Sequence, residues 1–107
     1  MKNRYAKELK SIVRRLIRLY RPETIILFGS SASGSASETS DIDLAVIKKT
    51  RRRFLDRLKD ALMAARPKEA LDVLVYTPDE VSDMELNKNS FWIHEIKEKG
   101  RILYQRS

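Results

Sequence analysis

The chain contains no cysteine among its 107 residues, which excludes disulfide bonds, zinc–thiolate sites and thiol catalysis. It also lacks long hydrophobic runs, because the longest ones, such as Thr24–Phe28, are far too short to cross a bilayer. Residues 1–20 scatter charges among their apolar positions, a pattern unlike that of a signal peptide. These absences predict a cytoplasmic protein that has no association with a membrane.

The composition is that of a folded, basic domain. Hydrophobic residues make up 42% of the chain, which is enough to form a core, and the length predicts a single domain over residues 1–107. The 22 lysines and arginines against 15 aspartates and glutamates give a net charge of +7. A basic chain favours an anionic partner, which could be a nucleotide, a nucleic acid or an acidic protein surface. The plainer interpretation is a charged, solvated exterior.

Hydrophobic periodicity predicts alternating helices and strands. Residues 3–20 form a predicted amphipathic helix, whose inward positions are Tyr5, Leu9, Ile12, Val13, Leu16, Leu19 and Tyr20. Strands are predicted at residues 24–28, 41–48 and 71–76. Residues 51–65 form a second predicted helix, with Phe54, Leu55, Leu58, Leu62 and Ala65 facing inward.

The remaining third of the chain adds two further helices. Thr77, Pro78 and Glu80 form a capping box with proline at the first helical position. A last helix is predicted over residues 91–99, with Gly100 ending it, and residues 102–104 form either a short edge strand or a packed tail. The predicted fold class is α/β (α+β), a small mixed β-sheet with packed helices.

The segment at residues 29–40 consists almost entirely of glycine, serine and alanine, and could be a linker or a loop. A linker would isolate one helix and one unpaired strand, a piece too small to fold alone. A loop that joins two strands of one sheet leaves neither an isolated helix nor an unpaired strand. We therefore predict a loop. Because Gly29 and Ser30 follow the first strand directly, the backbone amides and the serine hydroxyl can approach a phosphate closely.

Two aspartates, Asp41 and Asp43, stand one residue apart at the start of the second predicted strand. Side chains alternate along a strand, so both carboxylates share one face, and Ile42, Leu44 and Val46 point into the core. Adjacent carboxylates repel each other and need a compensating cation, and such hard oxygen ligands suit Mg²⁺ or Mn²⁺.

Asp72 occupies the second position of the third predicted strand, where a core residue is expected. If the second and third strands are neighbours, Asp72 faces the same spot as Asp41 and Asp43. Three converging carboxylates form a two-metal site for in-line attack at phosphorus. The alternative is structural: Asp41 caps a turn and Asp72 pairs with a lysine.

The stretch "GSSASGSASETSDID" resembles the Gly-Ser-x10-Asp-x-Asp signature of the DNA polymerase beta-like nucleotidyltransferase superfamily. The short chain and its ending "EKGRILY" resemble the minimal nucleotidyltransferases (MNT) of that superfamily. The resemblance implies the polymerase beta-like fold, with Gly29 and Ser30 binding the triphosphate. It implies that Asp41 and Asp43 bind two Mg²⁺ ions, with Asp72 as the third acid, which assists the attacking hydroxyl.

Members of this branch are typically antitoxins encoded with a HEPN-domain RNase toxin, and they transfer AMP from ATP to a toxin tyrosine. The resemblance therefore implies a protein adenylyltransferase with ATP as substrate and a HEPN-domain partner. One departure is that Ser31 and Ser33 stand where the branch often has basic residues. Charge could come instead from a partner or from the nearby cations, which are Lys48, Lys49 and Arg51 to Arg53.

Two other functions stay open. The same fold could neutralise a partner by covering it, with no chemistry. Nucleotidyl transfer to a small molecule or RNA is disfavoured, because such enzymes carry an extra helical domain. Direct nucleic-acid binding is not favoured, because no aromatic residues interleave the basic run "KKTRRR" at residues 48–53. His94 and Trp92 are most simply surface and packing residues. Whether the chain forms homo- or hetero-oligomers is left open.

Overall fold

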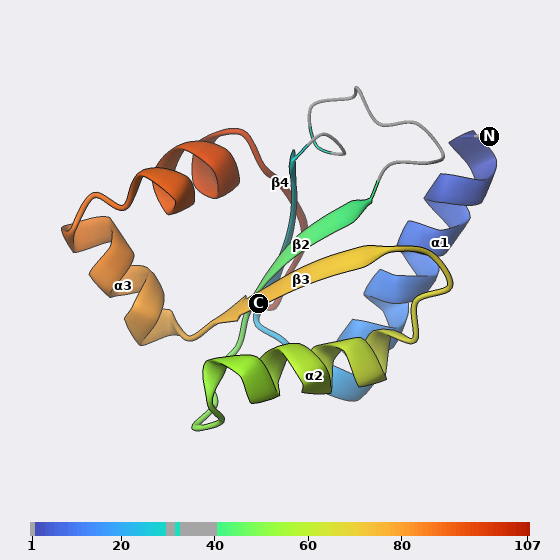
Figure 1. Cartoon of the computed structure of the whole chain (residues 1–107), viewed down its shortest axis with the longest axis horizontal. Coiled ribbons are helices and arrows are strands. Elements are labelled where there is room, and N and C mark those ends of the chain that lie inside the picture. Colours follow the sequence, from blue (N-terminus) through green and yellow to red (C-terminus); the bar gives the residue numbers. More distant parts are fainter. Residues whose placement is uncertain (1, 30–31, 33–40) are drawn as a thin grey trace.

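A computed structural model of the chain describes residues 2–29, 32 and 41–107. It contains a mixed sheet of four strands, in the order β3-β2-β1-β4 (Figure 1). The strands are β1 (Thr24–Phe28), β2 (Ile42–Ile47), β3 (Leu71–Tyr76) and β4 (Arg101–Gln105). β1 is antiparallel to β2 and to β4, whereas β2 and β3 are parallel. The predicted mixed sheet is confirmed, and residues 102–104 belong to an edge strand.

Helices cover both faces of this sheet. They are α1 (Lys2–Arg15), which continues into η1 (Leu16–Tyr20), then α2 (Phe54–Ala65), α3 (Pro78–Leu86) and η3 (Phe91–Glu98). Side chains of α1, η1 and α2 pack on one face, around Ile25, Leu27, Leu44 and Val46. Side chains of η3 and α3 pack on the other face, around Ile26, Phe28 and Ala45. The two groups of helices flank the sheet in Figure 1. No helix in the described part of the chain is both long and apolar enough to traverse a bilayer.

One of the predicted inward positions in the first helix and its extension differs from the prediction. Ile12 and Leu16 are fully buried, as predicted, but Leu19 is 56% exposed. The helix widens at this end, since the Arg21 amide donates to the Leu16 carbonyl five residues back, at 2.9 Å. This wider turn shifts the register of the last residues around the helix axis. The prediction that Leu19 faces inward was therefore wrong.

In the second helix the predicted inward residues Leu58, Leu62 and Ala65 pack in the core, whereas the two in its first turn are exposed. Leu55 is 75% exposed and Phe54 is 38% exposed, whereas Arg57 and Ala61 are buried. The Arg57 guanidinium is the cause, because it donates to the Val75 carbonyl at 3.2 Å and to Glu80 Oε1 at 2.7 Å. These bonds direct the Arg57 side of α2 toward the sheet and leave Leu55 in solvent.

Local signals near the other elements are largely confirmed. The capping box is present, with Thr77 Oγ1 accepting from the Glu80 amide at 3.1 Å and Glu80 Oε1 accepting from the Thr77 amide at 2.8 Å. β2 is shorter than predicted by one residue at each end, so Asp41 precedes the strand and Lys48 follows it. Trp92 is buried, and its Nε1 donates to Glu85 Oε2 at 2.7 Å.

Candidate functional site

Two of the three predicted acids are neighbours in the sheet. Asp43 of β2 lies in register with Asp72 of β3, near the start of both parallel strands. Residues in register on adjacent strands point to the same side, and alternation places Ala45 and Leu74 on that side too. Both of these residues pack in the core under η3. Asp43 and Asp72 therefore lie on the η3 face, beyond the edge of its apolar core.

The electrostatics of Asp43 reflect this crowding. Burial raises the pKa of the Asp43 carboxyl, and so do the charge of Asp72, a hydrogen bond between the two carboxyl groups, and the charge of Asp41. Like charges in one place each favour the protonated form of the other. A cation or a shared proton would relieve the repulsion. Perturbed acids of this kind cluster at functional sites more often than elsewhere.

The third predicted acid, Asp41, lies outside the strands that hold the other two acids. It lies one residue before β2 and is exposed, so strand alternation does not determine its direction. Over residues 2–29, 32 and 41–107, no three acidic or histidine side chains are gathered closely enough to hold a metal ion. The donor set nevertheless suits one, since Asp43 and Asp72 supply paired hard oxygens. Mg²⁺ typically takes one or two carboxylates and completes its shell with water and substrate phosphates.

Gly29 brings the start of the loop against the acids. It follows β1 directly and has φ of 74°, a left-handed conformation that glycine adopts without strain. A Cβ at this position would collide with Oδ2 of Asp43. The Ala32 amide donates to the Gly29 carbonyl at 3.2 Å, so the chain turns immediately after β1. Ser30, the other predicted phosphate-binding residue, lies outside the described residues.

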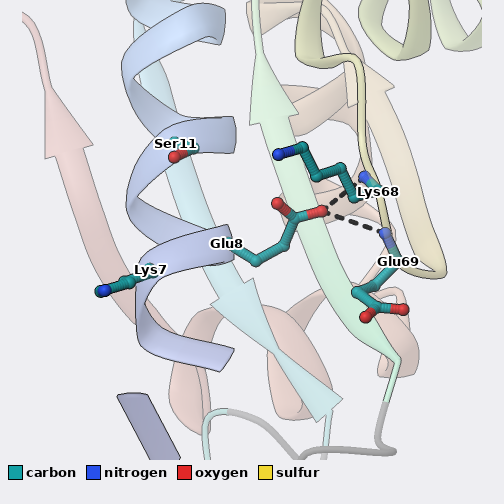
Figure 2. A pocket seen from close by; sticks show the side chains of 5 residues that line it. All are labelled: Lys7, Glu8, Ser11, Lys68 and Glu69. Carbon is teal, nitrogen blue, oxygen red and sulfur yellow. Dashed lines mark hydrogen bonds between the residues drawn. The ribbon is translucent and has the colours of Figure 1, made fainter. Parts of the chain in front are cut away.

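A cavity of about 510 Å³ has none of these acids in its lining. It is lined by Lys7, Glu8, Ser11, Lys68 and Glu69 (Figure 2). The Glu8 carboxylate reaches from α1 and accepts hydrogen bonds from the backbone amides of Lys68 and Glu69, at 2.5 and 3.0 Å. Glu8 thereby ties α1 to the turn that leads into β3. Since Asp72 is the second residue of β3, this contact helps to hold it in place.

Two buried charged residues, Glu8 and Arg57, were not predicted from the hydrophobic periodicity. A signal for Glu8 was available, because it stands three residues after Tyr5 and four before Ile12, inside the apolar stripe. Arg57 stands between Phe54 and Ala61 at the same spacings. A charge that interrupts an apolar stripe at helical spacing indicates a buried, hydrogen-bonded group.

The basic run at residues 48–53 is held at the other end of β2. Lys48 Nζ donates to the Tyr20 carbonyl at 2.6 Å and lies 4.7 Å from the centre of the Tyr20 ring. Arg52 pairs with Asp60 at 2.9 Å. Lys48 lies five positions after Asp43 along the extended chain, which is about 16 Å. The structure therefore does not bring these cations to the acids.

Comparisons with known proteins agree with this geometry. A family model described as "Polymerase beta, Nucleotidyltransferase" matches residues 7–107. A crystal structure from Sulfolobus solfataricus, of a protein provisionally assigned as a nucleotidyltransferase, superposes with a TM-score of 0.66 and 21% sequence identity. The match covers 94% of this chain and 79% of that chain, and at this identity it shows the fold. No curated protein matches the chain significantly.

Proposed function

Because the chain belongs to the polymerase beta nucleotidyltransferase family, we propose that it is a protein adenylyltransferase that moves AMP from ATP to a tyrosine of a HEPN-domain toxin. One observation carries the proposal. Asp43 and Asp72 are in register on parallel strands, with Gly29 against Asp43. The proposal is supported because Gly29, where the predicted phosphate-binding loop begins, lies against one of these paired carboxylates.

In the proposed reaction the tyrosine oxygen bonds to the α-phosphorus of ATP, the bond to pyrophosphate breaks, and pyrophosphate leaves. Asp72 would accept the proton of the attacking hydroxyl, and Asp43 and Asp41 would hold Mg²⁺. Gly29 and Ser30 position the triphosphate through backbone amides and the serine hydroxyl. When bound, the metal ions neutralise phosphate charge and favour ionisation of the hydroxyl.

The proposed acceptor comes from outside the chain. All described strands belong to the one sheet, and the described helices pack on its two faces. None of these elements forms a separate helical layer that could hold a small-molecule acceptor. The exposed position of Asp72 at the edge of the sheet suits an acceptor side chain that approaches from a second protein.

The test is transfer of radiolabelled AMP from ATP to the protein encoded beside this chain, which the proposal expects to be a HEPN-domain toxin, with mass spectrometry of the modified product. We expect the wild-type chain to transfer AMP in the presence of Mg²⁺. Asp43→Asn should lower the rate at least about a thousandfold, because several kcal/mol of charge stabilisation are lost. Asp83→Asn is the matched control, since it makes the same change at an exposed carboxylate of α3. It should leave the rate unchanged.

A second candidate function is a binding module that neutralises the toxin by covering it. The observation in its favour is that Ser31 and Ser33 replace loop cations, while the basic run at residues 48–53 lies away from the acids. If the wild-type chain transfers no more label than Asp43→Asn, and both silence the toxin, covering is the function. Calorimetric titration of ATP separates the two as well, because a metal-dependent enzyme binds ATP more tightly with Mg²⁺.

A further inference from the structure

A groove runs between α1 and the edge strand β4. Its first part has a volume of about 470 Å³ and is lined mainly by apolar side chains. Leu9, Val13 and Ile17 of the helix and Leu103 of the strand form its lining, and Lys10 and Arg14 stand beside them. Ala6 to Ile17 spans about 16 Å of helix, which is three turns. This length and volume suit a short helical segment, since ligand sites typically begin near about 300 Å³.

A β-bulge in β4 shapes the strand side of this groove. Ile25 of β1 pairs with Tyr104, but the next residue, Ile26, pairs with Ile102, so Leu103 is an extra residue in β4. Leu103 and Tyr104 consequently both pack on the α1 side of the sheet. Bulges re-aim side chains in this way and disrupt regular pairing along an edge. The β4 edge is therefore better suited to side-chain docking than to the addition of a strand.

The groove continues into a basic end. A second cavity of about 350 Å³ shares Ile17 with the first, and Arg18, Arg21 and Arg106 line it together with Pro22 and Tyr104. All three arginines are exposed. Burial lowers the pKa of the neighbouring Lys48, and the charges of Arg106 and Arg21 lower it further, although Glu23 acts in the opposite sense. Positive charge thus dominates at this end.

We propose that this α1–β4 groove docks an acidic amphipathic helix of a partner protein. Leucine-type side chains on one face of that helix fill the apolar part, and its carboxylates meet Lys10, Arg14 and the three arginines. Such a helix matches the apolar part of the groove with its leucine-type side chains and the basic end with its carboxylates. A second copy of this chain does not suit it, because each copy carries a net charge of +7. Nucleic acid would leave the apolar lining unmatched, and among the residues that the structure describes Tyr104 is the one aromatic residue in the lining of either cavity.

The groove goes beyond nucleotidyl transfer and is a separate feature from the acid site. Its basic end lies beside Pro22, which precedes β1, whereas Gly29 follows β1, and the strand between them is about 16 Å long. Docking in the groove needs neither nucleotide nor metal. An experiment can therefore show that the groove binds no helix while AMP transfer is still detected. It can equally show that the groove binds a helix while AMP transfer is absent.

The probe is a fluorescein-labelled synthetic helix with leucines at positions i, i+3, i+4 and i+7 and glutamates on its flanks, measured by fluorescence anisotropy. One control peptide has lysine in place of glutamate, and another has serine in place of leucine. We expect the acidic leucine peptide to bind at least about tenfold more tightly than either control. Backbone amide shifts by NMR should fall along α1 and β4.

Two charge-reversal variants with the same change in net charge locate the contact. Arg14→Glu combined with Arg18→Glu changes the groove and should weaken binding about tenfold. Lys49→Glu combined with Arg51→Glu changes exposed positions outside both cavities and should leave affinity near wild type. Equal binding of the three peptides, or equal effects of the two double variants, would overturn the proposal. Groove-dependent binding of a single-stranded RNA in place of the peptide, or self-association in sedimentation, would overturn it as well.

Discussion

Two carboxylates of this chain, Asp43 and Glu80, lie near opposite ends of the parallel strand pair and have opposite surroundings. Asp43, at the start of β2, faces Asp72, and burial together with that neighbour raises its pKa. Glu80, just after β3, accepts a hydrogen bond from Arg57 at 2.7 Å and another from the Thr77 amide at 2.8 Å. Burial alone would raise the pKa of Glu80, but these bonds lower it overall.

Glu80 is a carboxylate that stabilises the fold, whereas the ionised form of Asp43 is unfavourable in the fold. Arg57 joins α2 to the end of β3 and to the cap of α3, so its pair with Glu80 acts on three elements at once. The Asp43 and Asp72 pair joins no elements that the sheet has not already joined, and its like charges oppose each other. Proteins keep such unfavourable groups mainly where function needs them. The predictions below test this contrast.

Among the variants that test this contrast through stability, the largest effect is expected from Gly29→Ala, which acts on the acid end. Alanine at φ of 74° is strained, and its Cβ would displace the Asp43 carboxylate. The free energy of unfolding should fall by about 1–2 kcal/mol. AMP transfer should fall about a hundredfold even in folded protein, because a small misplacement of a catalytic group is costly.

Gly100→Ala serves as the control for this glycine. Its Cβ would collide with the Ile96 carbonyl and approach the Ile26 side chain, so it also destabilises the fold, but it contacts none of the acids. Thermal denaturation, together with the transfer rate measured well below the unfolding temperature of each variant, distinguishes the two variants. A Gly29→Ala protein that is destabilised yet fully active would show that the close approach to Asp43 has no catalytic role.

A smaller effect is expected from Glu80→Gln, which acts on the other carboxylate. Glutamine can still accept from Thr77 but loses the charge that pairs with Arg57, and the Glu80 side chain is 40% exposed. Solvent screening limits the loss in the free energy of unfolding to about 1 kcal/mol at neutral pH. Because the pKa of Glu80 is lowered, its stabilisation is full above the ordinary glutamate pKa and disappears as the pH falls through the lowered value.

Urea denaturation of wild type and Glu80→Gln at several pH values measures this difference. The two curves should converge in acid, and Glu95→Gln, which removes one partner of an exposed pair within η3, should follow wild type throughout. If the difference in the free energy of unfolding between wild type and Glu80→Gln does not narrow in acid, the lost stability comes from packing and not from the charge of Glu80.

Much of this fold follows from patterns in the sequence, and the exceptions have physical causes. The alternation in β2 predicted the burial of Ile42, Leu44 and Val46, and the capping box at Thr77 predicted the start of α3. Spacing within α2 makes Arg57 a candidate for the inner face, but it does not identify the partners that hold Arg57 there. Those partners, in β3 and at Glu80, lie elsewhere in the chain.

The candidate site shows the same limit. The sequence placed Asp72 beside Asp43 only on the condition that β2 and β3 pair, and the parallel register meets that condition. It predicted that Asp41 lies on the same strand face, but Asp41 precedes the strand, so alternation does not orient it. Ser30 lies outside the described residues, and the roles assigned to Asp41, Asp43, Asp72, Gly29 and Ser30 stay predictions until transfer is measured.

The smallest effect is expected from Asp43→Asn on stability in the presence of a chelator. Because the pKa of Asp43 is raised, the folded state disfavours the ionised form, and this penalty is full above the raised pKa. It disappears as the pH falls below the ordinary aspartate pKa. Asparagine removes the charge, so the variant should be more stable than wild type by about 0.5 kcal/mol at neutral pH, a small value because solvent screens the pair.

The gain in stability of Asp43→Asn should vanish in acid. The loss in stability of Glu80→Gln should vanish there too, so the two variants differ from wild type in opposite directions at neutral pH. Adding Mg²⁺ with ATP should raise the unfolding temperature of wild type more than that of Asp43→Asn, because a ligand that binds more tightly stabilises the folded state more at the same concentration. Differential scanning fluorimetry over a pH series, with Asp83→Asn as control, measures both effects. If Asp43→Asn is less stable than wild type at neutral pH, then Asp43 supports the fold as Glu80 does, and the contrast between the two carboxylates fails.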